Sequence, residues 1–169
     1  MALDPARYAE LFRTESQDQL AAINRALLTL EMERDAPAAA AAVAEMFRAV
    51  HTLKGMSATM GYQAVAEFAH ELESLLDRMR GEGRRPAPSV TDALFGAVDA
   101  LEAGVAEASE TAARSPAMEA ALGRLTVAFN QPDAGEPARV SGAELREEIV
   151  VRAAHRAEEI RLEIDLAHE

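Results

Sequence analysis

Cysteine and tryptophan are absent from this chain of 169 residues, and only 4% of its residues are aromatic. Without cysteine there is neither a disulfide framework nor a thiolate metal site, which suits a reducing compartment. No apolar run approaches the roughly 18 residues that a membrane helix needs, and the amino terminus carries no secretory signal pattern. We therefore expect a soluble, cytoplasmic protein with no membrane insertion.

Basic residues are scarce relative to acidic ones. The chain has 17 lysines and arginines against 29 aspartates and glutamates, which gives a net charge of −12. Binding to nucleic-acid phosphates through bulk electrostatics is therefore not expected. Lys54 is the only lysine. Lysine is a compact, flexible point charge, whereas arginine is a planar fork, so the two are not interchangeable. Lys54 is therefore a candidate for a specific role.

What the chain does contain is five stretches in which apolar residues recur at three- and four-residue steps, the period of an amphipathic helix. The predicted helices start near residues 4, 35, 62, 89 and 115. Gly61 is a stop signal for the second helix, and Ser89 to Asp92 resembles a capping box at the start of the fourth. Short connections favour an all-α fold, an up-and-down antiparallel four-helix bundle with an appended fifth helix.

The carboxyl-terminal part of the chain has a different character. Gln131 to Pro137 is rich in turn-forming residues, so we predict a bundle over residues 1–130, a linker over 131–142 and a short tail over 143–169. Ile160 to Leu166 alternates apolar and charged residues, the period of a half-buried strand. Because one strand cannot fold alone, we expect the tail to be the truncated start of a second domain.

The second predicted helix carries His51 on the flank of its apolar face. At about 100° per residue, this side chain points toward the boundary with water. Lys54 follows three residues later on the same flank, and Gly55 follows one turn later. Glycine in a helix interior costs roughly 0.5–1 kcal/mol relative to alanine. Gly55 and Ala58 would leave room over His51 for a second protein, so both are candidate docking positions.

An exposed histidine can act as a nucleophile through one ring nitrogen when a carboxylate accepts a hydrogen bond from the other. Because the turn between the second and third helices is tight, we expect Glu73 to lie within side-chain reach of His51. His70, one helical turn before Glu73, could position that carboxylate. Lys54 could offset the charge of an incoming or bound phosphoryl group.

Spacing alone leaves other interpretations open. His51 could be an ordinary surface residue, and His70 with Glu73 an ordinary solvated pair. A metal site formed by these three side chains is a further alternative. No pair of histidines has the i, i+4 spacing of a helical metal face, however, so no metal ion is expected.

The segment from Phe47 to Gly55, read together with Met60-Gly61-Tyr62 and with His70 to Asp77, resembles the histidine-phosphotransfer (HPt) domain of CheA-type chemotaxis histidine kinases. The resemblance covers roughly residues 5–130. It implies that His51 is the phosphorylated histidine, and that Glu73 hydrogen-bonds its ring. His70 and Lys54 match the other members of that polar network. Met56 departs from the family pattern, in which many members have a second glycine.

The resemblance further implies a phosphorelay. His51 would accept a phosphoryl group from ATP, delivered by the kinase's separate ATP-binding domain, and pass it to an aspartate of a response regulator of the CheY/CheB type. ATP and magnesium would be used by that other domain, so no cofactor is expected in this chain, which would be a substrate and relay rather than an enzyme. The tail could then begin a regulator-docking domain. The alternative is a helical interaction module that has lost phosphotransfer.

Overall fold

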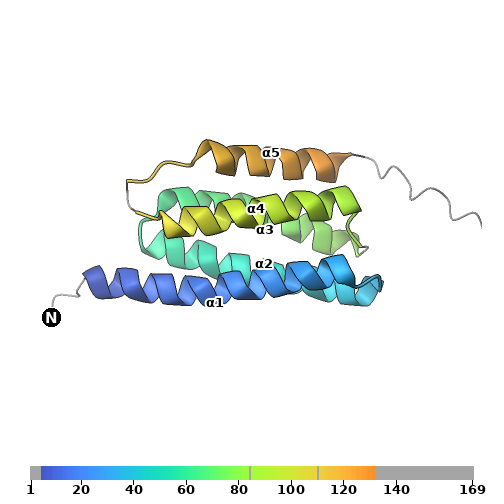
Figure 1. The fold of residues 1–169 in the computed structure, drawn as a ribbon, viewed down its shortest axis with the longest axis horizontal. Coiled ribbons are helices and arrows are strands. Elements are labelled where there is room, and N and C mark those ends of the chain that lie inside the picture. Colours follow the sequence, from blue (N-terminus) through green and yellow to red (C-terminus); the bar gives the residue numbers. More distant parts are fainter. Residues whose placement is uncertain (1–4, 84, 110, 132–169) are drawn as a thin grey trace, which may run out of the picture. The chain divides into compact units, whose positions relative to one another are not determined.

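The computed structural model describes residues 5–83, 85–109 and 111–131, and helices are the only regular secondary structure in this part of the chain (Figure 1). The predicted linker, apart from its first residue, and the predicted tail lie outside these ranges. Five helices follow one another in the described ranges: α1 (Pro5–Met32), α2 (Ala36–Thr59), α3 (Gln63–Glu82), α4 (Pro88–Ala106) and α5 (Pro116–Asn130).

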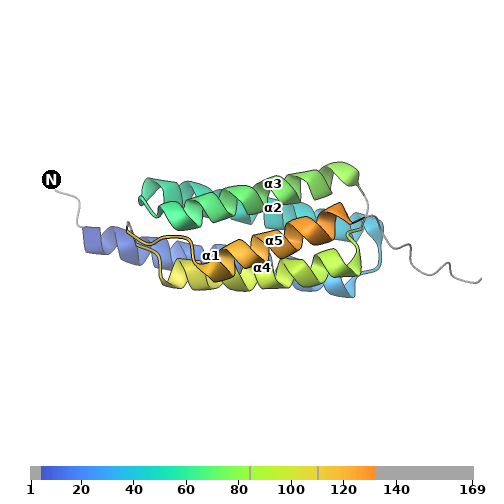
Figure 2. The same cartoon turned by 90° about the horizontal axis from the view of Figure 1, so that it is seen from above.

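Helices α1 to α4 form an antiparallel bundle in which each helix contacts its two neighbours. α1 packs on α2, α2 on α3, α3 on α4, and α4 closes the bundle against α1. α5 lies outside this ring, in the groove between α3 and α4 (Figures 1 and 2). The predicted fold class, a four-helix bundle with an appended fifth helix, is confirmed for the described residues.

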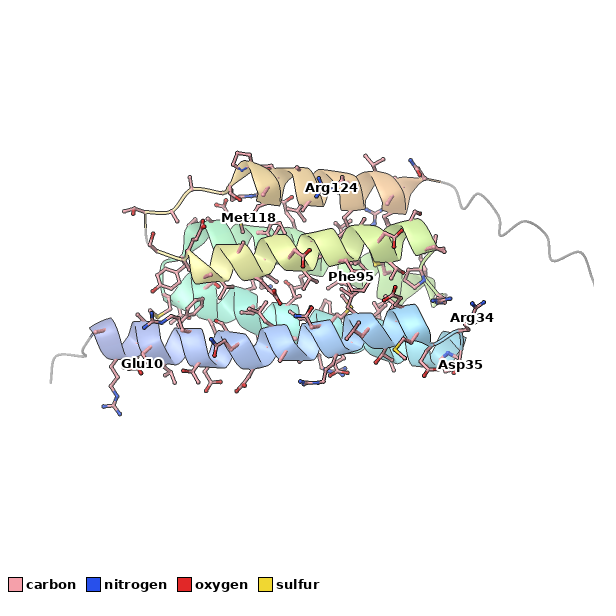
Figure 3. All side chains as sticks on the ribbon, viewed as in Figure 1. Glu10, Arg34, Asp35, Phe95, Met118 and Arg124 are labelled. Atoms are coloured by element: carbon pink, nitrogen blue, oxygen red, sulfur yellow. The ribbon has the colours of Figure 1, made fainter. Side chains whose placement is uncertain are left out.

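The bundle interior is made of aliphatic and small side chains with few rings. Figure 3 shows these side chains filling the space between the helices, with Met118 of α5 directed toward α4. Alanines on every helix allow the backbones to approach closely, which compensates for the low aromatic content. The largest fully buried side chains are Phe68, Ile23, Leu27, Leu30, Met46, Leu53, Leu72, Leu76, Leu94, Leu101, Leu125 and Val43.

The turn between α2 and α3 is short and fully hydrogen-bonded. Tyr62 N–H donates to the Ser57 carbonyl at 2.9 Å and Gly61 N–H to the Ala58 carbonyl at 3.1 Å, the two bonds of a Schellman motif. Gly61 adopts φ +72°, a left-handed conformation that favours glycine. The predicted stop at Gly61 is therefore confirmed, and the turn sets α3 directly beside α2.

A glycine ends α3, and a proline starts α4. α3 ends at Glu82, and its C-cap Gly83 has a left-handed φ of +63°. The predicted capping box at Ser89 is wrong. α4 begins at Pro88, with Ala87 rather than Ser89 at the N-cap and no side-chain capping bond. A proline at the first helical position favours a helix start there and holds the preceding residue extended, so Pro88 sets this boundary in place of the capping-box pattern.

Candidate functional site

His51 lies on the exposed edge of α2 that faces α3. Its neighbours Val50 and Leu53 are fully buried and fix the rotation of the helix, whereas the side chain of His51 is 61% exposed. Helical side chains lean toward the amino terminus, so the imidazole covers the preceding turn. Phe47 lies in that turn, and its ring stacks on the imidazole at a centroid distance of 6.2 Å.

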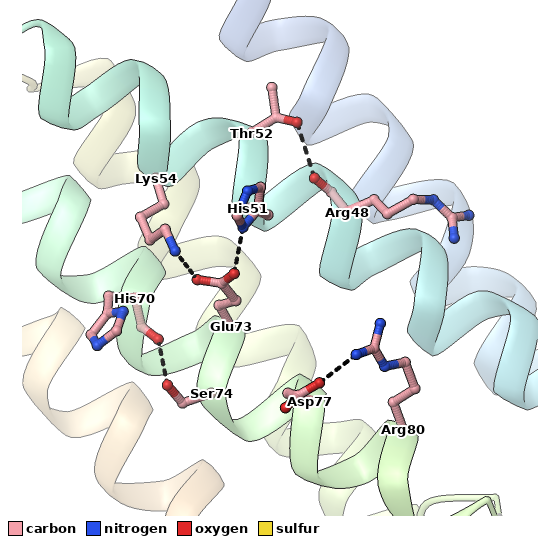
Figure 4. Close-up of polar contacts among 9 residues, drawn as sticks. All are labelled: Arg48, His51, Thr52, Lys54, His70, Glu73, Ser74, Asp77 and Arg80. Atoms are coloured by element: carbon pink, nitrogen blue, oxygen red, sulfur yellow. Dashed lines mark hydrogen bonds and ion pairs between the residues drawn. The ribbon is translucent and has the colours of Figure 1, made fainter.

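Glu73 reaches the imidazole from α3. Its Oε1 lies 2.5 Å from Nδ1 of His51, and its Oε2 accepts a hydrogen bond from Nζ of Lys54 (Figure 4). Glu73 is only 8% exposed. A buried carboxylate costs free energy unless it is paired, and both oxygens of Glu73 are paired.

The ionisation of Glu73 reflects two opposing influences. Burial disfavours the charged carboxylate and raises its pKa. The hydrogen bonds and charge interactions from Lys54 and His51 together outweigh burial, so the pKa of Glu73 lies below its ordinary value. Glu73 is therefore ionised near neutral pH and can carry the negative charge that the site needs.

This lowered pKa predicts a pH dependence of stability. A carboxyl whose pKa is lower in the folded than in the unfolded state stabilises the fold at neutral pH, and this contribution is lost as the pH falls from about 5 through the folded-state pKa. Urea unfolding of wild type and Glu73→Gln between about pH 7 and pH 3 checks this expectation. The wild type should lose more stability on acidification than the variant, and equal losses would contradict the pairing.

The hydrogen bond to Glu73 also determines which ring nitrogen is available for chemistry. An ionised carboxylate only accepts hydrogen bonds, so Nδ1 of a neutral His51 carries the proton and Nε2 carries the lone pair. This tautomer is inferred from the partner. This arrangement suits a nucleophilic histidine. The ring is exposed to solvent, and the carboxylate of Glu73 can stabilise the positive charge that would develop on the ring when Nε2 attacks.

His70 does not join this group in the structure. Its side chain is exposed, its ring points away from the Glu73 carboxylate (Figure 4), and within the described ranges it makes no hydrogen bond to Glu73. The backbone carbonyl of His70 accepts a bond from Ser74 instead. No three potential ligand side chains among the described residues come close enough to hold a metal ion. The positioning role of His70 stays a prediction.

The surface beyond His51 is open. Gly55 and Ala58 are both exposed, and a Cβ placed on Gly55 would meet nothing within 4 Å. A longer side chain at this position would lean back over the imidazole. Gly55 also borders a shallow hollow of about 480 Å³ between α1 and α2, whose lining is mainly apolar and whose other members are Tyr8, Leu11, Phe12, Glu15, Met56, Thr59 and Met60.

Three residues near His51 were not singled out as site residues by sequence reasoning. Phe47 is half-buried and contacts the imidazole. The guanidinium carbon of Arg80 lies 4.3 Å from the centre of the Phe47 ring, and the same guanidinium pairs with Asp77 at 2.6 Å. Asp77 and Arg80 follow Glu73 at four- and seven-residue steps, and Phe47 precedes His51 by four residues, so the helix period could have indicated all three.

A family model described as the Hpt domain matches residues 7–166. The chain belongs to the Hpt domain family. In this Hpt domain, the pair of His51 and Glu73 joins neighbouring antiparallel helices of the bundle. In the described ranges no helix is both long and apolar enough to cross a membrane.

Curated relatives of this Hpt domain are chemotaxis proteins. "Chemotaxis protein CheA" of Bacillus subtilis (strain 168) is 42% identical over 100 residues, which cover 59% of this chain and 14% of that protein. The CheA protein of Halobacterium salinarum (strain ATCC 29341 / DSM 671 / R1) is 36% identical over 104 residues, 62% of this chain and 15% of that protein. The chain thus spans about one seventh of the length of these relatives.

A solved structure has the same fold. It is the crystal structure of the phosphorylated P1 domain of CheA3 in complex with CheY6 from R. sphaeroides. It matches with a TM-score of 0.63 and 30% sequence identity, covering 73% of this chain and 95% of that chain. The resemblance to a CheA-type Hpt domain, first stated from sequence motifs, is confirmed.

Proposed function

We propose that this chain is the phosphorelay domain of a two-component chemotaxis kinase and that Nε2 of His51 carries the phosphoryl group. The hydrogen bond between Nδ1 of His51 and Glu73 is the observation that carries this proposal, because it leaves the exposed Nε2 with a lone pair. No other histidine in the described ranges has a carboxylate bound to its ring.

The proposed reaction has two steps. The lone pair of Nε2 attacks the γ-phosphorus of ATP, a phosphorus–nitrogen bond forms, and the bond to ADP breaks. Glu73 would stabilise the positive charge that develops on the imidazole, and Lys54, which is bonded to Glu73, is proposed to offset charge on the phosphoryl group. A carboxylate oxygen of a response-regulator aspartate then attacks phosphorus, the phosphorus–nitrogen bond breaks, and His51 returns to its neutral form.

The partners in this scheme lie outside the chain. A separate ATP-binding domain of the full kinase is proposed to hold ATP and magnesium and to present the γ-phosphate in the cytoplasm. A regulator of the CheY or CheB type is proposed as the acceptor. Support for a regulator comes from the related P1 domain of CheA3, which forms a complex with CheY6.

The face proposed for partner approach is the open surface over Gly55 and Ala58, continuous with the hollow between α1 and α2. Tyr8 and Leu11 of α1 are exposed there despite their apolar character, and Leu11 is 54% exposed. An apolar hollow beside a reactive group suits a protein partner that must exclude water from the transfer.

A two-stage labelling experiment tests the proposal. The purified chain is incubated with the catalytic core of a CheA-type kinase and γ-labelled ATP, freed of nucleotide, and then mixed with a CheY-type regulator. Acid-labile label should appear on the chain and then move to the regulator. A chain that binds the regulator but never acquires label would instead be an interaction module that has lost phosphotransfer.

Two substitutions at Gly55 test the docking face. Gly55→Ala should raise the free energy of unfolding by about 0.5–1 kcal/mol and keep phosphotransfer, because its Cβ meets no atom and alanine favours helix. Gly55→Leu should keep the fold but slow transfer to the regulator by roughly ten-fold or more, because its side chain covers the imidazole. Equal transfer rates in the two variants would remove Gly55 from the docking face.

A further inference from the structure

The imidazole of His51 is held in position at only one of its nitrogens. Nδ1 is bonded to Glu73, but the side chain is 61% exposed, so packing alone gives the ring little restraint. A single hydrogen bond leaves the ring free to tilt about it. A second restraint is needed to direct Nε2 toward one approach path, because reacting atoms must be aligned closely for an efficient transfer.

Phe47 supplies a contact of this kind. It lies one helical turn before His51, and the two ring planes are inclined by only 21° at a centroid distance of 6.2 Å. Phe47 is half-buried against the core, which limits its own movement on the inner side. Its ring is therefore suited to restrain the imidazole, provided that its outer part is also restrained.

Arg80 of α3 provides the outer restraint. Its guanidinium carbon lies 4.3 Å from the centre of the Phe47 ring, within the range of a cation–π contact, and Asp77 binds the guanidinium at 2.6 Å. The Asp77–Arg80 pair is about half exposed and contributes little stability by itself. It does orient the guanidinium, since the carboxylate and the aromatic ring hold it at two places.

We infer that Arg80 is a positioning residue for phosphotransfer, which acts on His51 through Phe47. α3 would thus restrain the imidazole twice, directly through Glu73 and indirectly through Arg80. The inference rests on the proposed function for its rate effect, but the orientation of the unphosphorylated ring can be measured without any phosphotransfer.

The same helix offers a matched control. Arg78 lies two residues before Arg80, and its guanidinium carbon lies 4.5 Å from the centre of the Phe129 ring of α5. It also donates a hydrogen bond to Asn130 at 3.1 Å. Arg78→Ala and Arg80→Ala therefore remove the same charge and the same kind of contact from one helix. Of these two contacts, only that of Arg80 involves a ring stacked on His51.

The experiment compares wild type, Arg80→Ala, Arg80→Lys and Arg78→Ala. Phosphorylation by the catalytic core of a CheA-type kinase is measured over a range of chain concentrations to separate kcat from KM. Arg80→Ala should lower kcat by about two- to five-fold at unchanged KM, the equivalent of one exposed cation–π contact. Arg80→Lys keeps a cation over the ring and should recover most of the rate, while Arg78→Ala should match the wild type.

Nuclear Overhauser contacts between the rings of Phe47 and His51, measured without ATP, give the second readout. They should weaken in Arg80→Ala and persist in Arg78→Ala, although both variants lose similar thermal stability. Equal kcat in the two alanine variants, a loss confined to KM, or unchanged ring contacts in Arg80→Ala would overturn the inference. Absence of label in the wild type would instead refute the proposed function, and the ring contacts would still test Arg80.

Discussion

Replacing His51 with glutamine is expected to reduce phosphoryl uptake by the chain to background. The amide nitrogen of glutamine has no lone pair available for attack on phosphorus, whereas Nε2 of the imidazole does. Because the His51 side chain is 61% exposed and contributes little to the core, the variant should stay folded. The measurement is acid-labile label on the chain after incubation with a CheA-type catalytic core and γ-labelled ATP.

Two control variants sharpen this result. His70→Gln removes the other histidine in the described ranges, which is exposed and has no carboxylate on its ring, and it should retain the label. His51→Asn places an amide nitrogen near the position of Nδ1, so it can keep the bond to Glu73 and still lacks a nucleophile. Label persisting on both His51 variants would mean that another side chain carries the phosphoryl group.

Replacing Glu73 with alanine is expected to slow phosphorylation of His51 by about 100-fold. Three effects act together. The tautomer with a lone pair on Nε2 loses its preference, the imidazole loses its bond to α3, and the positive charge that develops during attack loses its partner. The initial rate of labelling at saturating ATP and catalytic core measures the loss, and circular dichroism checks that the helices remain.

Glu73→Gln separates orientation from charge. Its carbonyl oxygen can still accept a hydrogen bond from Nδ1, but its amide group is neutral and directs donors toward Lys54. Its rate should fall between those of wild type and Glu73→Ala, because orientation survives and charge stabilisation does not. A Glu73→Ala variant that is labelled at the wild-type rate would remove the carboxylate from the mechanism.

The sequence predicts those parts of the fold that depend on residues close together in the chain. The helical period of apolar residues indicated each helix, and Gly61 marked the turn that makes α2 and α3 neighbours. From that adjacency followed the proximity of His51 and Glu73, which the structure shows. The start of α4 lies close to the predicted residue, but its N-cap is Ala87, because the backbone restriction of Pro88 prevails over the hydroxyl of Ser89.

The details of the site could not be predicted in the same way. Periodicity predicts the face of a helix but not the rotamer of a long side chain. The sequence therefore predicted a role for Lys54 beside the phosphoryl group, but it did not predict the hydrogen bond from Lys54 to Glu73. His70 has the correct spacing for Glu73, but its ring lies in solvent instead. The contact of Arg80 with Phe47 joins residues 33 positions apart on different helices, and only the packed pair of helices brings them together.

The helical hairpin of α2 and α3 supplies Glu73 and Phe47, which contact the imidazole, and also Lys54 and Arg80, which contact those two side chains. His51 and Glu73 are 22 residues apart in the chain, and the short Schellman turn joins their helices. The entropy lost on closing so short a segment is small, and local contacts of this kind form rapidly during folding. We therefore expect the reactive pair to assemble with this hairpin, before the outer helix α5 docks, so that fraying of α5 leaves the chemistry intact.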